Sequence, residues 1–211
     1  MDHKICFYDV ESTGFGPKDE VIQIAGIITS WDLKIHNAFN YFTFTNCPID
    51  PRAREVHGLD INTVYKLSNG RYLEQIMDNE LRWFREEQNI IFVAYNDEFD
   101  KRLINQTLIQ NNCDGIDFGK KVHCLPRKAS GRFNLDACAL FAAALNNNIK
   151  WKLETYSYKK TKYTMDQIIS MYKYMTSTLK VPTREKAHHD ALFDAFIMWL
   201  IMAENRVYMY G

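Results

Sequence analysis

The chain has 211 residues, 46% of them hydrophobic and 25% charged, which is the composition of a globular protein, and its net charge of zero gives no overall attraction for nucleic acid. Its five cysteines are scattered without a Cys-x-x-Cys pair, so neither a zinc site nor a disulfide framework is expected. No apolar run reaches the roughly 20 residues of a membrane span, and the first residues leave no room for a signal peptide, so we expect a cytoplasmic protein without a membrane partner.

The first part of the chain predicts strands that are separated by turn residues. Residues 5–10, 21–29 and 37–45 have the composition of three consecutive strands, the start of an antiparallel meander. A further apolar run at 89–95 predicts a buried strand.

Helical spacing of apolar residues is found between and after these strands. It predicts helices over the following segments: 72–87, 97–110, 135–145, 164–175 and 191–206. The predicted strands come first in the chain, and helices and strands alternate after them. This order predicts one α/β domain over residues 1–211.

Charge is segregated along the chain although it sums to zero. Residues 1–115 carry 11 Lys and Arg against 18 Asp and Glu, whereas residues 116–186 carry 14 against 5. This asymmetry indicates a surface for a polyanion on one side and metal-binding acids on another. Solvated faces that separate by chance are the alternative, which charge alone does not exclude.

Acidic residues stand in segments whose other residues are typical of buried structure. Asp9 and Glu11 end the first strand and, being two residues apart, leave it on the same face. Asp194 is the one charged residue of the apolar stretch 191–203, which is typical of a buried helix. Asp100 stands in the first helical turn after the fourth strand, where active sites of α/β proteins gather.

Four converging carboxylates cannot all stay ionised without compensation. A pair of Mg²⁺ or Mn²⁺ ions supplies it, because oxygen ligands suit these cations. Two such ions can activate water and stabilise the leaving oxygen of a phosphodiester, so the acids predict phosphodiester hydrolysis. For Asp194 the alternative is a carboxylate that hydrogen-bonds to backbone or caps a neighbouring helix.

The acidic residues belong to motifs that follow one another in a fixed order. They are DVESTG at 9–14, a His-Gly loop at 49–59, NDEFD at 96–100 and HDALFD at 189–194. In order and spacing they resemble the motifs of the DEDDh (DnaQ-like) family of 3′→5′ exonucleases. The resemblance implies a ribonuclease H-like fold, in which a mixed central sheet, with a meander as its first three strands, is flanked by α-helices.

The resemblance also implies roles for individual residues. It implies two bound divalent cations, Mg²⁺ or Mn²⁺, held by Asp9, Glu11, Asp100 and Asp194. It assigns His189 as the general base that deprotonates the attacking water, and an ordinary histidine, which titrates near pH 6.5, can take that proton. His188 is the rival, and the register of the motif favours His189.

Further positions correspond to those that approach the terminal nucleotide in the family: Thr13 with the adjacent Gly14, His57 and Asn96. Asn96 is equally well placed as a helix N-cap, and Phe15 either stacks on a base or belongs to the core. For Asp97 and Glu98 only solvent exposure is expected. The family varies most in the Lys- and Tyr-rich segment at about 146–182, which either guides a single strand or forms a solvated hairpin.

We expect hydrolysis from the 3′ end of nucleic acid with release of 5′-mononucleotides, and single-stranded DNA in proofreading or repair is the favoured substrate. An RNA 3′-end exoribonuclease is the alternative, because the motifs are shared and no residue indicates a contact to a 2′-hydroxyl. A catalytically silent nucleic-acid-binding module is a third possibility, against which the four intact acids argue. No sequence feature predicts a polymerase partner or a dimer face.

Overall fold

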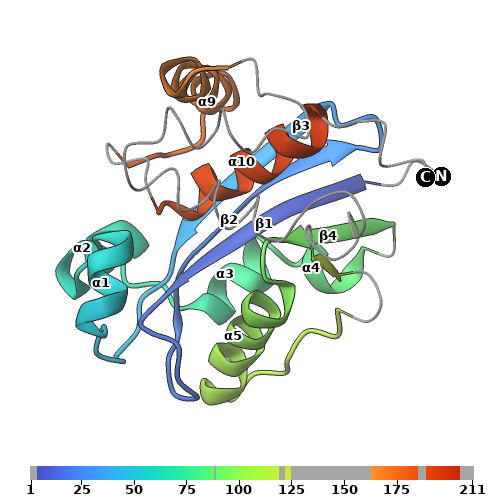
Figure 1. The fold of residues 1–211 in the computed structure, drawn as a ribbon. Coiled ribbons are helices and arrows are strands. Elements are labelled where there is room, and N and C mark those ends of the chain that lie inside the picture. The colour runs from blue at the N-terminus through green and yellow to red at the C-terminus, as the bar shows by residue number, and fades with distance from the viewer. Residues whose placement is uncertain (1–3, 88, 119–121, 125–162, 185–188, 205–211) are drawn as a thin grey trace.

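The computed structural model describes residues 4–87, 89–118, 122–124, 163–184 and 189–204. Among these residues, five strands form a central sheet, and Figure 1 shows the arrangement of the elements around it. The strands are β1 Lys4–Ser12, β2 Val21–Ser30, β3 Ile35–Phe42, β4 Ile90–Ala94 and β5 Val122–Cys124, in the order β3-β2-β1-β4-β5. The first three pair antiparallel, whereas β4 pairs parallel with β1 and β5 parallel with β4. The expected meander and mixed sheet are therefore confirmed.

Helices cover both faces of this sheet. The described helices are α1 Pro51–His57, α2 Ile61–Ser68, α3 Leu73–Asn79, α4 Trp83–Glu86, α5 Asp97–Gln110, α9 Met165–Leu179 and α10 Ala191–Glu204. Figure 1 shows α9 and α10 on one face and α3, α4 and α5 on the other. Figure 1 also shows α1 and α2 near the end of β1.

Alternate residues of β1 face the two helical layers. The even-numbered residues of Cys6–Val10 pack in one hydrophobic cluster with α3 and α5. Ile5 and Phe7 pack in a different cluster, which contains residues of α10. Asp9 and Glu11 continue this second series, so β1 directs both carboxylates to the face that α10 covers.

The single helix predicted over 72–87 is wrong, because the segment is divided between α3 and α4. The N–H of Leu81 bonds at 2.9 Å to the carbonyl of Ile76, five residues earlier, and this wide turn ends α3. The change of direction places both Leu81 and Phe84 in the same buried cluster, each at most 3% exposed.

The other predicted helices fall into two groups. The helices predicted over 97–110, 164–175 and 191–206 are found as α5, α9 and α10. The helix predicted over 135–145, and the Lys- and Tyr-rich segment as far as residue 162, lie outside the described residues. Among the helices that the structure describes, none is long and apolar enough to cross a membrane.

Candidate active site

Three carboxylates converge near the carboxyl end of β1. Asp9 and Glu11 come from β1, and Asp194 comes from the first turn of α10. One oxygen of each carboxylate lies within 4.8 Å of the others. Helix α10 brings Asp194 there because its apolar residues pack against β1 and β2. The fold therefore brings three of the four predicted acids together, although Asp9 and Asp194 are 185 residues apart in the chain.

The fourth acid, Asp100, lies beside this group. It stands in the first turn of α5 and is 2% exposed. Asp100 is not part of the three-carboxylate set. After desolvation by burial, however, its charge is the largest cause of the raised pKa of Asp9, so the two acids are close enough to interact strongly. A backbone hydrogen bond from Val10 to Asp100 links α5 to β1 at this point.

Burial and mutual repulsion make the ionised form of this cluster unfavourable. Desolvation is the main cause that raises the pKa of all four carboxyls, to about 8 for Asp100 and about 7 for Asp194. The nearby positive charge of Arg184 opposes the rise at Glu11 and Asp194. Among the described residues, positive charge therefore compensates the cluster only in part at neutral pH.

These raised pKa values predict that stability depends on pH when no divalent cation is present. The folded protein holds protons on Asp100 and Asp194 that the unfolded chain releases, so their stabilisation is lost as pH rises through about 7 and 8. Between pH 6.5 and 8.5 we expect the free energy of unfolding to fall by on the order of 2 kcal/mol. Urea denaturation in EDTA measures this slope.

Two controls separate the acidic cluster from other titrating groups. The pKa of His57 is lowered to about 4, mainly by burial. His57 therefore makes the free energy of unfolding rise with pH, but only below about pH 6.5, outside the range measured. Saturating Mg²⁺ is expected to reduce the slope, because a cation favours the ionised carboxylates at every pH. Stability that rises from pH 6.5 to 8.5 in EDTA would contradict the strongly raised pKa values.

The donor set of the cluster fits hard divalent cations. Carboxylate oxygens are the ligands that Mg²⁺ and Mn²⁺ prefer, and the three clustered residues supply no sulfur or nitrogen donor. A divalent cation would also supply the positive charge that the raised pKa values show to be missing. Asp9, Glu11 and Asp194 are therefore the residues that could hold a cation, with Asp100 next to them.

Asp97 and Asn96 differ from what the sequence suggested. Asp97 was expected to be solvent-exposed, but it is 8% exposed, and its Oδ1 has no hydrogen-bond partner among the described residues. The reason is its place in the first turn of α5, which packs against the sheet. Asn96 occupies the N-cap position of α5, yet its side chain makes no capping hydrogen bond, so the capping alternative is wrong for the side chain.

His189 stands directly before Asp190, the residue at the start of α10, and is half-buried. Its backbone has φ of 49°, the left-handed conformation that is uncommon for residues other than glycine. The residue therefore turns the chain sharply into α10. His188, the alternative general base, lies outside the described residues.

His57 is held by two internal hydrogen bonds. It ends α1, is 2% exposed, and its Nδ1 accepts from the N–H of Leu59 at 3.0 Å. Its Nε2 lies 3.1 Å from the carbonyl of Ser12, to which it donates as the neutral tautomer. Both ring nitrogens are thus engaged, and the imidazole connects the His-Gly loop to the end of β1.

Thr13 and Gly14 follow β1 at the start of the loop to β2. The Thr13 hydroxyl is buried, donates to Asp19 Oδ1 at 2.8 Å and accepts from the N–H of Glu20 at 2.9 Å. A Cβ on Gly14 would lie 2.7 Å from the Asp19 carboxylate, so a side chain here would displace the carboxylate that binds Thr13 and Gly16. The Thr13 hydroxyl therefore shapes this loop, and the predicted substrate contact of this side chain stays a prediction.

Phe15 lies on the surface in the same loop. It is 62% exposed, so the alternative that it belongs to the core is wrong. Its ring centroid lies 5.7 Å from that of Phe99, and the Arg102 guanidinium lies 5.4 Å from the Phe99 centroid. An exposed aromatic next to a cation is suited to stack on a base.

Two residues of this region were not singled out from the sequence. Asp190 is fully buried and caps α10, since its Oδ1 accepts from the N–H of Leu192 at 3.2 Å. Arg184 bonds to Asp190 and reaches the backbone of both His57 and His189. An acid directly before an apolar helix is an N-cap signal that could have indicated Asp190. No local pattern indicates Arg184, because its contacts depend on the tertiary fold.

The mixed sheet and its acidic cluster define an α/β protein with a candidate divalent-cation centre. The model of the exonuclease family RNase_T matches residues 6–125, more than half of the chain. The chain therefore belongs to this exonuclease family, which confirms the resemblance to DEDDh exonucleases. The matched residues include Asp9, Glu11 and Asp100, and they end before His189 and Asp194. No curated protein sequence matches the chain.

Solved structures of exonucleases share the fold. E. coli exonuclease I in a zinc-bound complex with single-stranded DNA is 14% identical, with a TM-score of 0.62 over 100% of this chain. Exonuclease I of Methylocaldum szegediense is 15% identical, with a TM-score of 0.54 over 98%. The chain spans 42% of both proteins. Exonuclease X bound to 5′-overhanging duplex DNA is 21% identical, with a TM-score of 0.51 over 96% of this chain and 91% of that one. The ribonuclease H-like fold is thereby confirmed.

Proposed function

We propose that the chain is a metal-dependent 3′→5′ exonuclease that releases 5′-mononucleotides from single-stranded DNA, with a role in repair or proofreading. The observation that carries this proposal is the convergence of Asp9, Glu11 and Asp194, with oxygens within 4.8 Å of one another, in a chain of an exonuclease family. Such a cluster has little use in a catalytically silent binding module, because its repulsion destabilises the fold.

The acids would hold two divalent cations, Mg²⁺ or Mn²⁺. Asp9, Glu11 and Asp194 supply the clustered oxygens, and Asp100 completes the set of four from the neighbouring α5. When bound, the cations supply a Lewis acid that polarises the phosphodiester and stabilises the charge that develops on its oxygens. The four acids would hold the positive charge of the cations at the end of β1. The 3′ end of the DNA strand would bind at this place.

His189 would act as the general base. It precedes Asp194 by five residues, at the entrance to α10, so the imidazole and the acidic cluster belong to one local structure. A ring nitrogen would take the proton of the attacking water as its oxygen bonds to phosphorus and the bond to the 3′-oxygen breaks, and the proton would pass through solvent to that leaving oxygen. Because that nitrogen must be neutral to accept a proton, activity is expected to rise with pH through the pKa of the imidazole.

Substrate would be positioned by the surface beside the acids. Phe15 offers an exposed ring for stacking, and Asn96 offers an exposed amide at the start of α5. Thr13, Gly14 and His57 would contribute through the backbone of their turns, because the Thr13 hydroxyl and the His57 ring nitrogens are engaged internally. Structural neighbours in complex with single-stranded or 5′-overhanging DNA support the choice of DNA over RNA.

Degradation of matched DNA and RNA strands tests the proposal. With 5′-labelled single strands of the same sequence in Mg²⁺, we expect a ladder of products that shorten from the 3′ end, formed faster on DNA. Chromatography of the small products is expected to show 5′-mononucleotides. Cleavage at internal positions, or an uncut strand in both substrates, would contradict an exonuclease, and faster degradation of RNA would reverse the assigned substrate.

A further inference from the structure

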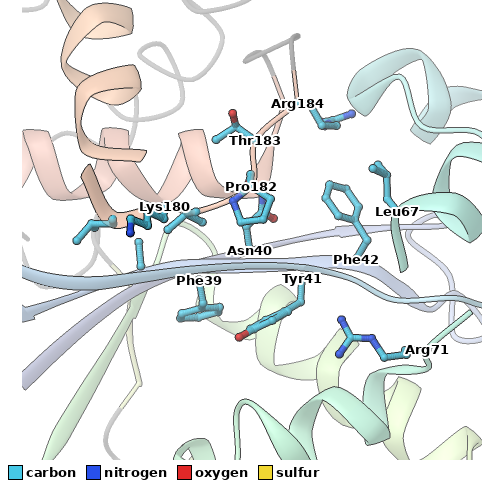
Figure 2. Close-up of a pocket in the computed structure, with 13 residues that line it drawn as sticks. Phe39, Asn40, Tyr41, Phe42, Leu67, Arg71, Lys180, Pro182, Thr183 and Arg184 are labelled. Carbon is cyan, nitrogen blue, oxygen red and sulfur yellow. The ribbon is translucent and has the colours of Figure 1, made fainter. Parts of the chain in front are cut away.

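Arg184 joins three separate parts of the structure. It ends the described segment that follows α9, which crosses β3 and is fixed there by a 2.9 Å hydrogen bond from Asn40 Nδ2 to the Pro182 carbonyl. Figure 2 shows this segment above β3, with the Arg184 side chain leaving it beside the pocket that Phe42 and Leu67 help to line. The side chain is 12% exposed, so its donors serve the protein rather than solvent.

Each of the three guanidinium nitrogens donates to its own partner. Nη1 donates to the carbonyl of His57 at 2.8 Å, and Nη2 donates to the carbonyl of His189 at 2.6 Å. Nε donates to Asp190 Oδ2 at 2.9 Å. One side chain thus connects the end of α1 with the residue before α10, and the planar guanidinium fixes the two carbonyls relative to each other.

Asp190 anchors Arg184 to the sheet. Its carboxylate is fully buried, and Oδ2 also accepts from Gln23 Nε2 of β2 at 3.1 Å. The same Gln23 nitrogen donates to Asn40 Oδ1 of β3 at 2.8 Å. A buried charge pair with several hydrogen bonds is costly to displace, because displacement leaves a charge without compensation. Arg184 is therefore a rigid support.

The backbone at both carbonyls needs such a support. His189 has φ of 49°, a conformation that persists when surrounding contacts determine it. His57 is the last residue of α1, where helix carbonyls lack partners within the helix, and the cation there is favourable. Without Arg184, the carbonyls of both residues would lose this hydrogen bond.

We propose that Arg184 is a positioning residue for the reaction, and this inference rests on the proposed function of His189. Arg184 holds the His189 backbone, and hence the imidazole, in a fixed place relative to the acidic cluster and the His-Gly loop, without contacting the substrate. A displacement of about 1 Å in a catalytic group lowers rates by about 100-fold. Loss of Arg184 therefore lowers kcat while KM changes little.

Two substitutions of Arg184 test this role. Arg184→Lys keeps the charge beside Asp190 but cannot reach both carbonyls, and we expect kcat to fall about 10-fold with KM within about 3-fold. For Arg184→Met we expect kcat to fall about 100-fold. Arg71→Lys and Arg71→Met are matched controls, since Arg71 also pairs with a carboxylate, Glu80, and lines the same pocket. These control variants are expected to keep kcat.

A second background separates positioning from general destabilisation. In a His189→Ala chain, Arg184→Lys is expected to lower kcat by less than about 2-fold, because the group that it positions is gone. An equal loss in both backgrounds, or an unchanged kcat in Arg184→Lys, would overturn the inference. If Arg184→Met does not fold, Arg184→Lys decides. A His189→Ala chain with the full rate would overturn the proposed function itself.

Discussion

Asp9→Asn is expected to lower the rate of nucleotide release by about 1,000-fold or more. Asp9 is central to the cluster, since its carboxylate belongs to the three-carboxylate set and is also affected by the charge of Asp100. An amide oxygen binds a divalent cation more weakly than a carboxylate. A bound cation contributes several kcal/mol of stabilisation to the transition state, and each 1.4 kcal/mol corresponds to a factor of ten in rate.

The same substitution is expected to leave the fold intact. In EDTA at pH 8, Asp9→Asn should melt at the same temperature as the unmodified chain or higher, because it removes one half-buried charge from a repulsive cluster. Asp32→Asn is the matched control, since Asp32 is exposed in the turn between β2 and β3, and it should change neither quantity. An active Asp9→Asn chain would contradict the role of the cluster, and an unfolded one would show that Asp9 is needed for the structure.

His189→Ala is expected to lower kcat by about 100- to 10,000-fold, the range for loss of a general base. Cation binding should persist, because the three clustered ligand candidates are carboxylates and do not include His189. The rise in melting temperature on addition of Mg²⁺ measures cation binding independently of activity. A lower kcat together with an unchanged Mg²⁺-dependent rise in melting temperature would indicate that His189 acts in proton transfer and not in cation binding.

The control for this variant is His36, a histidine of the sheet that lies outside the acidic cluster. His36 is exposed in β3, and His36→Ala should keep both the rate and the Mg²⁺-dependent rise. The remaining activity of His189→Ala should also lose the pH dependence that the imidazole confers. A variant with the full rate would exclude His189 as the base.

The central fold could be predicted because local and tertiary preferences agree there. In β1 the alternation of apolar residues is continued by Asp9 and Glu11, which places both carboxylates on one face. In α5 and α10 the apolar spacing identifies the helices, and the first turn of each carries a predicted acid. Short-range patterns therefore indicated the acids and the elements that present them.

The break between α3 and α4 could not be predicted, because helical spacing continues through it. Tertiary packing produces the hydrogen bond from the Leu81 N–H to the Ile76 carbonyl and buries Leu81 in the same hydrophobic cluster as Phe84. The burial of Asp97 has a similar origin, since a first-turn acid is normally exposed unless the helix end packs against the sheet.

The contacts through which Arg184 supports the site join residues that are even farther apart in the chain. Arg184 and His57 are 127 residues apart in the chain, and no spacing rule relates them. The sequence likewise suggested a substrate contact for His57, whereas the structure engages both of its ring nitrogens with backbone at Ser12 and Leu59. Motifs thus indicated which residues lie near the site, and the fold determined how each one is held.

The most direct test of a metal-dependent exonuclease is nucleotide release from a 3′-labelled single strand of DNA, followed during removal and return of divalent cations. With EDTA we expect no release, and with Mg²⁺ or Mn²⁺ restored we expect release of the labelled 5′-mononucleotide as the first product. Because the acidic cluster of Asp9, Glu11 and Asp194 is the proposed cation site, full release in EDTA would contradict that mechanism.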